Sequence, residues 1–237
     1  MTITPSPLQA RLAAVNERIA AACVRAGREP GSVTLVAVSK TFPAQVVRGA
    51  AAAGQRHFGE NYVQESVEKI AEMSGNDGVD SLIWHFIGPI QSNKTRPIAQ
   101  NFQWVHTIDR EKVARRLSEQ REARLPALQV CIEVNVSGEA SKSGVNPEEL
   151  QALADAVATL PRLRLRGLMA IPEPTTDEAL ARRRFARLRE LRDALNGRGH
   201  RMDTLSMGMS ADMDAAIAEG ATLVRIGTAI FGERKHA

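Results

Sequence analysis

Short apolar runs alternate with amphipathic helical segments along most of the chain. The first helical segment has apolar residues on one face from Leu8 to Cys23 and is predicted to end near Gly27. Beyond it, eight apolar runs are predicted strands, at residues 33–39, 57–59, 83–87, 104–108, 128–136, 165–171, 204–207 and 223–226. Amphipathic helices are predicted between them, at residues 43–53, 62–73, 110–123, 147–160, 177–196 and 211–219.

Strands that alternate with helices predict parallel strands joined by crossover helices. Eight such units favour an α/β fold of the (β/α)8 TIM barrel type. A doubly wound open sheet stays as the alternative, because the strands near residues 57 and 204 are weak. No linker or compositional break divides the chain, so we expect residues 1–237 to form a single domain. Its expected parts are a flexible start (1–7), an N-terminal helix (8–27) and the barrel (33–234).

Composition narrows the class of protein. Apolar residues make up 43% and charged residues 24%, which is typical of a globular domain. A net charge of only +4 and an aromatic content of 4% argue against a nucleic-acid surface. No apolar run approaches the roughly 20 residues of a membrane span, and residues 1–7 lack a signal pattern. Cys23 and Cys131 have no CxxC spacing and are expected to be buried thiols, so we expect a cytoplasmic protein.

The segment LVAVSKTFP (35–43) carries the sharpest chemistry, because Lys40 stands where the first predicted strand leaves the core. In a barrel, the carboxyl ends of the strands form the active-site face. Val36, Val38 and Lys40 share one face by alternation, which places the amine at the barrel mouth. Partial burial favours a neutral, nucleophilic amine that reacts with aldehydes. The alternative is a lysine that reaches solvent from a strand end.

The loops after the last two predicted strands have the features of an anion site. In SMGMSADMD, Gly208 permits close backbone approach and Ser210 is the predicted N-cap of a helix from Ala211. In RIGT, Gly227 and Thr228 follow the eighth strand. Barrels often hold phosphate in these loops, so a phosphate site is predicted. Ordinary loop chemistry without a ligand is the alternative.

Arg225 lies within the eighth predicted strand, whose two faces are both covered in a barrel. A buried guanidinium needs a partner, either an internal carboxylate or an acceptor on a ligand. Together with an aldehyde-reactive lysine and a phosphate site, Arg225 points to pyridoxal 5′-phosphate (PLP) as the cofactor.

Several long motifs resemble one family. They are LVAVSKT, FGENYVQE, WHFIGPIQSNK, SGEASKSG and LSMGMSADMDAAIAEGATLVRIGTAIFGER. Over about residues 33–234 the chain resembles the pyridoxal phosphate homeostasis proteins, barrel proteins of PLP fold type III that are similar to the alanine racemase N-terminal domain. The resemblance implies that Lys40 holds PLP as an internal aldimine (a Schiff base) and that Arg225 faces the pyridine nitrogen. It also implies phosphate contacts from Ser206, Gly208, Met209, Gly227 and Thr228, and a pocket lined by Asn61, His85 and Met169.

The resemblance also bears on activity. An arginine at the ring nitrogen disfavours protonation of that nitrogen, which weakens the ring as an electron sink. Alanine racemases take a second base, a tyrosine, from an additional domain that we expect to be missing here, and the one tyrosine of this chain is Tyr62. We therefore expect a protein that carries or buffers PLP in vitamin B6 and amino-acid homeostasis, without rapid turnover.

Other interpretations stay open. A slow racemase-like enzyme would use His85 or Tyr62 as its base, and a sugar-phosphate enzyme would need no cofactor. Lys142 is a second lysine to test for cofactor attachment, although it is also a candidate surface lysine. The expected partners are PLP and PLP-dependent apoenzymes, with no nucleic acid or membrane, and the expected state is a monomer.

Overall fold

Eight parallel strands close into a barrel in chain order. The computed structural model describes residues 6–74, 82–138 and 143–233. The last strand pairs with the first, and Val36 lies opposite Arg225. The predicted TIM barrel is confirmed, and an open sheet is excluded because the barrel is closed. The strands are β1 (Thr34–Val38), β2 (His57–Glu60), β3 (Ile83–Phe86), β4 (Trp104–Ile108), β5 (Leu128–Glu133), β6 (Leu163–Met169), β7 (Thr204–Ser206) and β8 (Leu223–Ile226).

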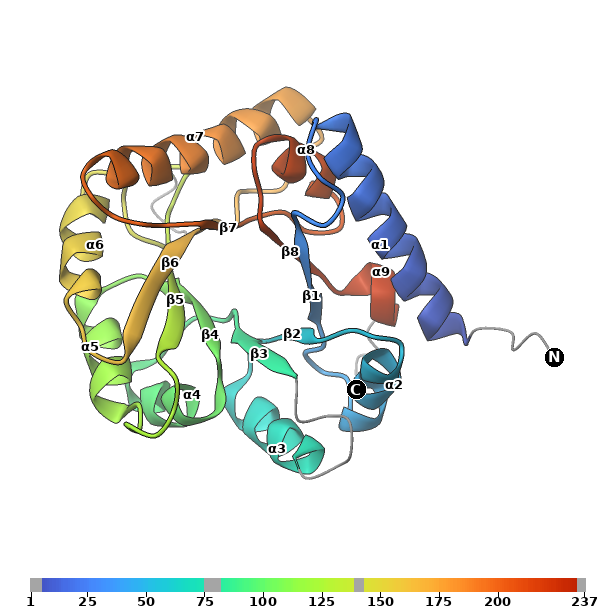
Figure 1. Cartoon of the computed structure of the whole chain (residues 1–237), viewed down its shortest axis with the longest axis horizontal. Helices are drawn as coiled ribbons and strands as arrows, with labels where there is room; N and C mark the ends of the chain where they lie inside the picture. Colours follow the sequence, from blue (N-terminus) through green and yellow to red (C-terminus); the bar gives the residue numbers. More distant parts are fainter. Residues whose placement is uncertain (1–5, 75–81, 139–142, 234–237) are drawn as a thin grey trace.

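The helices form a ring around the strands (Figure 1). They are α1 (Pro7–Arg25), α2 (Ala44–Ala52), α3 (Val63–Met73), the 3-10 turn η1 (Ser92–Lys94), α4 (Thr95–Asn101), α5 (Glu111–Gln120), α6 (Leu150–Ala158), α7 (Glu178–Gly197), α8 (Met213–Ala218) and α9 (Thr228–Phe231). The six predicted interstrand helices are present with shifted ends. Helices α4 and α9 were not predicted. Helix α4 is short and contains Pro97, which is tolerated in its first turn, and α9 has only four residues.

The N-terminal helix α1 packs against the part of the barrel where β8 meets β1. Figure 1 shows it running along α8 and α9, and the Arg11 guanidinium donates a hydrogen bond to the Ile230 carbonyl. Its start has a capping box, in which Ser6 and Gln9 bond to each other's backbone amides. Ser6 and Pro7, expected to be flexible, therefore begin the helix. Residues 1–5 lie outside the described residues.

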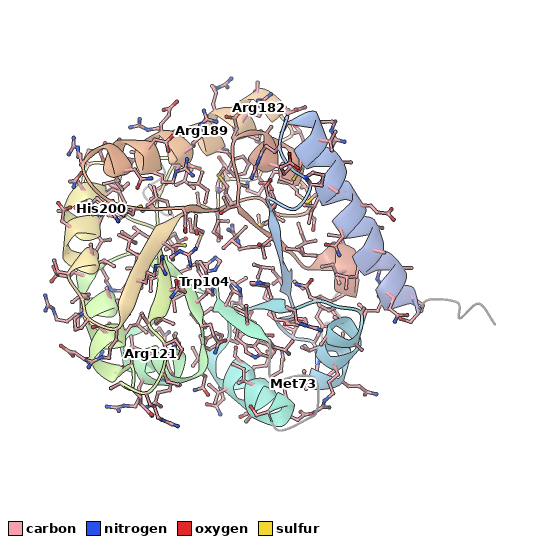
Figure 2. All side chains as sticks on the ribbon, in the orientation of Figure 1. Met73, Trp104, Arg121, Arg182, Arg189 and His200 are labelled. Atoms are coloured by element: carbon pink, nitrogen blue, oxygen red, sulfur yellow. The ribbon has the colours of Figure 1, made fainter. Side chains whose placement is uncertain are left out.

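Aromatic rings fill the barrel toward its amino-terminal end. Figure 2 shows Trp104, the first residue of β4, within the ring of strands. The His85 ring stacks on it at a centroid distance of 5.5 Å, and the Arg166 guanidinium lies 5.0 Å from its ring centroid. Rings thus occupy the interior toward the amino ends of the strands, whereas the carboxyl ends form the face at which barrels carry their functional sites.

Two further expectations concern the class of protein. Cys23 and Cys131 are both buried and unbridged, as predicted. Among the helices of the described ranges, none is both long and apolar enough to cross a bilayer.

Candidate functional site

Lys40 directly follows Ser39 at the carboxyl end of β1, where it is half-buried. The turn after β8 lies against the same strand end. A Cβ atom added to Gly227 would lie only 3.2 Å from the Val38 carbonyl oxygen, so glycine permits this approach. The closed barrel therefore brings Lys40 and the RIGT turn to one rim, as the sequence predicted.

The backbone turn that carries Lys40 is strained and clamped. Thr41 has a φ of 69°, an unfavourable left-handed conformation for a β-branched residue. Such a conformation costs about 1–3 kcal/mol and persists where neighbours hold it. The Thr41 amide donates to Glu65 Oε1 at 2.7 Å, and Lys69 Nζ donates to the Ser39 carbonyl at 2.9 Å and to Glu65 at 2.9 Å. Glu65 and Lys69 of α3 thus fix the backbone on both sides of Lys40, and we call these contacts the clamp.

Glu60 belongs to this clamp rather than to the barrel interior. Its Oε1 accepts hydrogen bonds from Ser39 Oγ and Lys69 Nζ, both at 2.6 Å, and the residue is fully buried. Burial raises the pKa of the Glu60 carboxyl, against the lowering effect of Lys69. Lys69 carries no sequence signal beyond its place four residues after Glu65, so its role emerges only from the fold.

Arg225 is buried inside the barrel, and its hydrogen-bond partners are neutral oxygens rather than the internal carboxylate considered from the sequence. Its Nη1 donates to Ser206 Oγ at 2.6 Å, and its Nη2 donates to the Ala170 carbonyl at 2.9 Å. Burial lowers its pKa to about 10, and the negative charge of Glu133 is the main opposing influence. The guanidinium therefore stays charged at neutral pH.

Glu133, at the end of β5, was not singled out from the sequence. It is buried, and burial, with repulsion from Asp109, raises the pKa of its carboxyl to about 7, while Arg225 acts in the opposite direction. A signal was present, because Glu133 alternates with Gln129 and Cys131 along a covered strand. A carboxylate in such a pattern indicates a functional or paired position.

Two predicted site residues point their hydrogen-bonding groups into the barrel core. His85 is fully buried, and both of its ring nitrogens lie 2.9 Å from another imidazole nitrogen, one of His57 and one of His106. The Ser206 hydroxyl contacts Arg225 and His106. His57 and His106 were missed, because their proximity depends on tertiary structure.

The loop after β7 differs in part from its prediction. Gly208 has a φ of 95°, and an added Cβ would lie 2.6 Å from the Ala216 Cβ, so only glycine fits. The prediction that Ser210 caps a helix from Ala211 is wrong, because α8 begins at Met213. The Asp212 carboxylate accepts the Met209 amide at 2.6 Å, which stabilises a turn in place of the first helical residues.

The remaining predicted residues lie at or just after the carboxyl ends of other strands. Asn61 follows β2, and its buried Oδ1 has no hydrogen-bond partner among the described residues. Met169 ends β6 and is fully buried, opposite Glu133 and Ser206 in the two adjacent strands. Thr228 begins α9. Lys142 lies outside the described residues.

Comparisons with known proteins show the family of this chain. The family model of the alanine racemase N-terminal domain matches residues 11–235. The pyridoxal phosphate homeostasis protein of Pseudomonas aeruginosa is 62% identical over 231 residues, which cover 98% of this chain and 97% of that protein. The Escherichia coli protein of the same name is 56% identical over 229 residues, covering 95% and 96%.

Solved structures extend the comparison. PipY of Synechococcus elongatus, with PLP bound, is 36% identical and has a TM-score of 0.83, over 95% of this chain and 100% of that one. An alanine racemase from Corynebacterium glutamicum is 18% identical with a TM-score of 0.66, and this chain covers 62% of it, so that likeness shows the fold alone. The chain therefore belongs to the family of the pyridoxal phosphate homeostasis proteins, within the alanine racemase N-terminal domain family.

Proposed function

We propose that this protein binds PLP covalently through Lys40 and carries or buffers it, in vitamin B6 and amino-acid homeostasis. The observation that carries the proposal is the rim where Lys40 follows β1 beside the Gly227 turn and the buried Arg225. The names of the relatives and the PLP bound in PipY support the choice of cofactor.

The residues at this end of the barrel fit such a group. Asn61 Oδ1, to which no described residue hydrogen-bonds, is a buried acceptor that a ligand donor or water can satisfy. The Gly227 turn lacks the side chain that would fill the space beside Val38. Arg225 is a buried cation, and its hydrogen-bond partners, the Ser206 hydroxyl and the Ala170 carbonyl, are neutral. Its positive charge can therefore interact with an acceptor atom of the cofactor ring.

Each residue then has a role in the proposal. Lys40 attaches the cofactor, and Arg225 faces the ring nitrogen. Gly208, Gly227 and Thr228 contact the phosphate through the turns after β7 and β8, while Asn61 and Met169 line the ring. Ser206, Met209 and His85 are less available for contacts with the cofactor. The Ser206 hydroxyl, the Met209 amide and the His85 nitrogens already have hydrogen-bond partners within the protein.

Bound PLP would supply an aldehyde that condenses with a neutral amine with loss of water, and a ring that accepts electrons. Arg225 limits the second property. Its cationic guanidinium makes a second positive charge at the ring nitrogen unfavourable, so proton loss from an attached amino acid gains little. Arg225 thus favours binding of the cofactor over catalytic turnover of an amino acid.

A racemase-like activity is the second candidate. His85 is an unsuitable base, because it is fully buried with both nitrogens occupied. Tyr62 is 51% exposed at the start of α3, so it is accessible to a ligand or solvent. We also place the protein in the cytoplasm as a monomer, and the two buried thiols fit a reducing compartment.

The attachment is tested with a matched pair of lysine variants. Wild-type protein incubated with PLP should gain a visible absorption band, and Lys40→Ala should lose it while remaining folded, because Lys40 is half-buried at a strand end and lies outside the buried core. Lys112→Ala, which changes an exposed lysine of α5, should keep the band. An unchanged band in Lys40→Ala would reject the proposed attachment.

Carrier and enzyme are separated by incubating the loaded protein with L-alanine and D-alanine in deuterated water. We expect neither inversion nor deuterium at the α-carbon at a catalytic rate. Rapid exchange in wild type that is lost in Tyr62→Phe would support the racemase-like alternative.

A further inference from the structure

Three histidines form a continuous hydrogen-bonded line through the barrel interior. His57 Nδ1 lies 2.9 Å from His85 Nε2, and His85 Nδ1 lies 2.9 Å from His106 Nε2. His106 Nδ1 lies 2.7 Å from Ser206 Oγ, which in turn accepts from Arg225 at 2.6 Å. We call His57, His85, His106 and Ser206 the histidine relay.

The relay crosses the barrel rather than following its wall. Its histidines come from β2, β3 and β4, whereas Ser206 and Arg225 come from β7 and β8. His85, His106 and Ser206 are fully buried, and only His57, at the amino end of β2, is half-buried. The relay therefore joins the floor of the proposed cofactor site to the opposite end of the barrel.

The donors and acceptors assign a direction to the line. A guanidinium only donates, so Ser206 Oγ must accept from Arg225. Ser206 is fully buried, and His106 Nδ1 is the one of its two side-chain partners that can accept a proton, so we assign the hydroxyl proton to the 2.7 Å contact with His106. His106 must carry its own proton on Nε2 and donate it to His85, and by the same reasoning His85 donates from Nε2 to His57.

Burial favours the neutral form of the relay histidines. Burial lowers the pKa of His106 to about 3, and the positive charge of Arg225 acts in the same direction. Burial, with the neighbouring imidazoles, holds the pKa of His85 well below its usual value, and burial lowers that of His57. Other charged groups face Arg225 from β5 and the β7 loop, namely Glu133 and Asp212, while Arg166 of β6 lies over Trp104.

A metal site does not explain the cluster. No set of three or more His, Cys, Asp or Glu side chains in the described part of the chain is placed to hold a metal ion. Each ring nitrogen that faces another histidine of the relay also takes part in a hydrogen bond, so it has no free lone pair for a metal ion.

Ser206 connects the histidines to Arg225 through its two hydrogen bonds. A hydroxyl that donates a hydrogen bond becomes a better acceptor, because linked hydrogen bonds polarise one another. With the Ser206 proton fixed toward His106, the Ser206 lone pairs face Arg225 Nη1. Without His106, the hydroxyl can rotate and offer its proton toward the guanidinium, which would turn Arg225 away.

We propose that His57, His85 and His106 are positioning residues, all in the neutral Nε2–H form, that orient Arg225 toward the cofactor ring through Ser206. The role of Arg225 toward the ring rests on the proposed function, whereas the proton arrangement of the relay is a property of the cofactor-free protein.

The arrangement is measured by nitrogen-15 NMR of histidine-labelled, cofactor-free wild-type protein, with signals assigned by single His→Gln variants. At neutral pH we expect His85 and His106 to show a protonated Nε2 and an unprotonated Nδ1. A protonated Nδ1 at His106, or a cationic ring at either residue, would overturn the relay whether or not the protein binds PLP.

The positioning role is tested with two variants of His106. His106→Asn keeps an acceptor near the place of Nδ1, whereas His106→Leu removes it. We expect His106→Leu to weaken PLP binding by about tenfold, since a hydrogen bond to a charged group is disturbed, and to shift the visible band. His106→Asn should stay within about threefold of wild type.

Equal effects of Asn and Leu, or no effect of a folded Leu variant, would contradict positioning. Should His106→Leu fail to fold, Ser206→Ala replaces it, because that variant removes the acceptor of Arg225 directly and must weaken binding by a similar factor. Failure of the proposed function would look different: wild type itself would take up no PLP, while the NMR result would stand.

Discussion

At the scale of single residues, the site is defined by charges that the fold removes from water. Glu133, at the carboxyl end of β5, interacts electrostatically with Asp109, which follows β4, and with Arg225 of β8. The pKa of Glu133 rises to about 7 although a cation is near, so the cost of burial exceeds the attraction. This carboxyl changes its charge near neutral pH and should couple stability to pH.

Glu133→Gln tests this coupling. Glu133 has a raised pKa when folded, so the unfolded state binds fewer protons between pH 4.5 and about 7, and wild-type stability falls as pH rises across that window. The variant lacks this group. Relative to Glu133→Gln, wild type should lose on the order of 2–3 kcal/mol in free energy of unfolding between those limits.

The measurement is urea unfolding of both proteins at several pH values. Taking the difference removes the opposite contribution of the buried histidines, which destabilise both proteins as pH falls below 6.5. A difference that is constant with pH would show that Glu133 titrates normally.

At the scale of elements, α1 takes the covering role that a longer final helix would have. Helix α9 has only four residues, and α1 packs along it and along α8. Leu12, Val15, Ile19 and Cys23 form its buried face. The helical layer beside β1 and β8 therefore includes a segment that comes before the first strand.

Ile19→Ala tests the covering role of α1. Ile19 is 4% exposed, so its truncation should lower the free energy of unfolding by about 2–4 kcal/mol. Val24→Ala, at a residue of the same helix that is 63% exposed, should change it by less than about 0.5 kcal/mol. Equal effects of the two substitutions would contradict the packing of α1 onto the barrel.

The elements also show where prediction from sequence succeeds. Apolar periodicity is a local property, and it located all eight strands and the barrel. It failed where a side chain competes with the helix for backbone amides. The Asp212 carboxylate accepts a hydrogen bond from the Met209 amide, and α8 begins only at Met213. It also missed α4, whose Pro97 resembles a helix breaker.

The candidate site divides in the same way. Lys40, Arg225 and the glycine turns were predictable, because strand ends of a barrel meet at one face. The clamp by Lys69 and the histidine relay were not, because their partners lie far apart in sequence, as His106 and Ser206 do. Only the closed structure brings such residues together.

At the scale of the whole molecule, closure of the barrel makes the first and last strands neighbours. That single topological fact places Lys40 at the rim that holds Arg225 and the Gly227 turn, and it lets the histidine relay reach Arg225 from the other side of the barrel. Lys40, at that rim, is therefore the residue that we propose to bond to the aldehyde of the cofactor.

The most direct test is borohydride reduction of the PLP-loaded protein, followed by proteolysis and mass spectrometry of the peptides. We predict one reduced cofactor adduct, on the peptide that contains Lys40. Lys69, the buried lysine of the clamp, should remain unmodified because its amine is held by Glu60, Glu65 and the Ser39 carbonyl. An adduct on Lys69, Lys142 or another lysine, with Lys40 unmodified, would contradict the account.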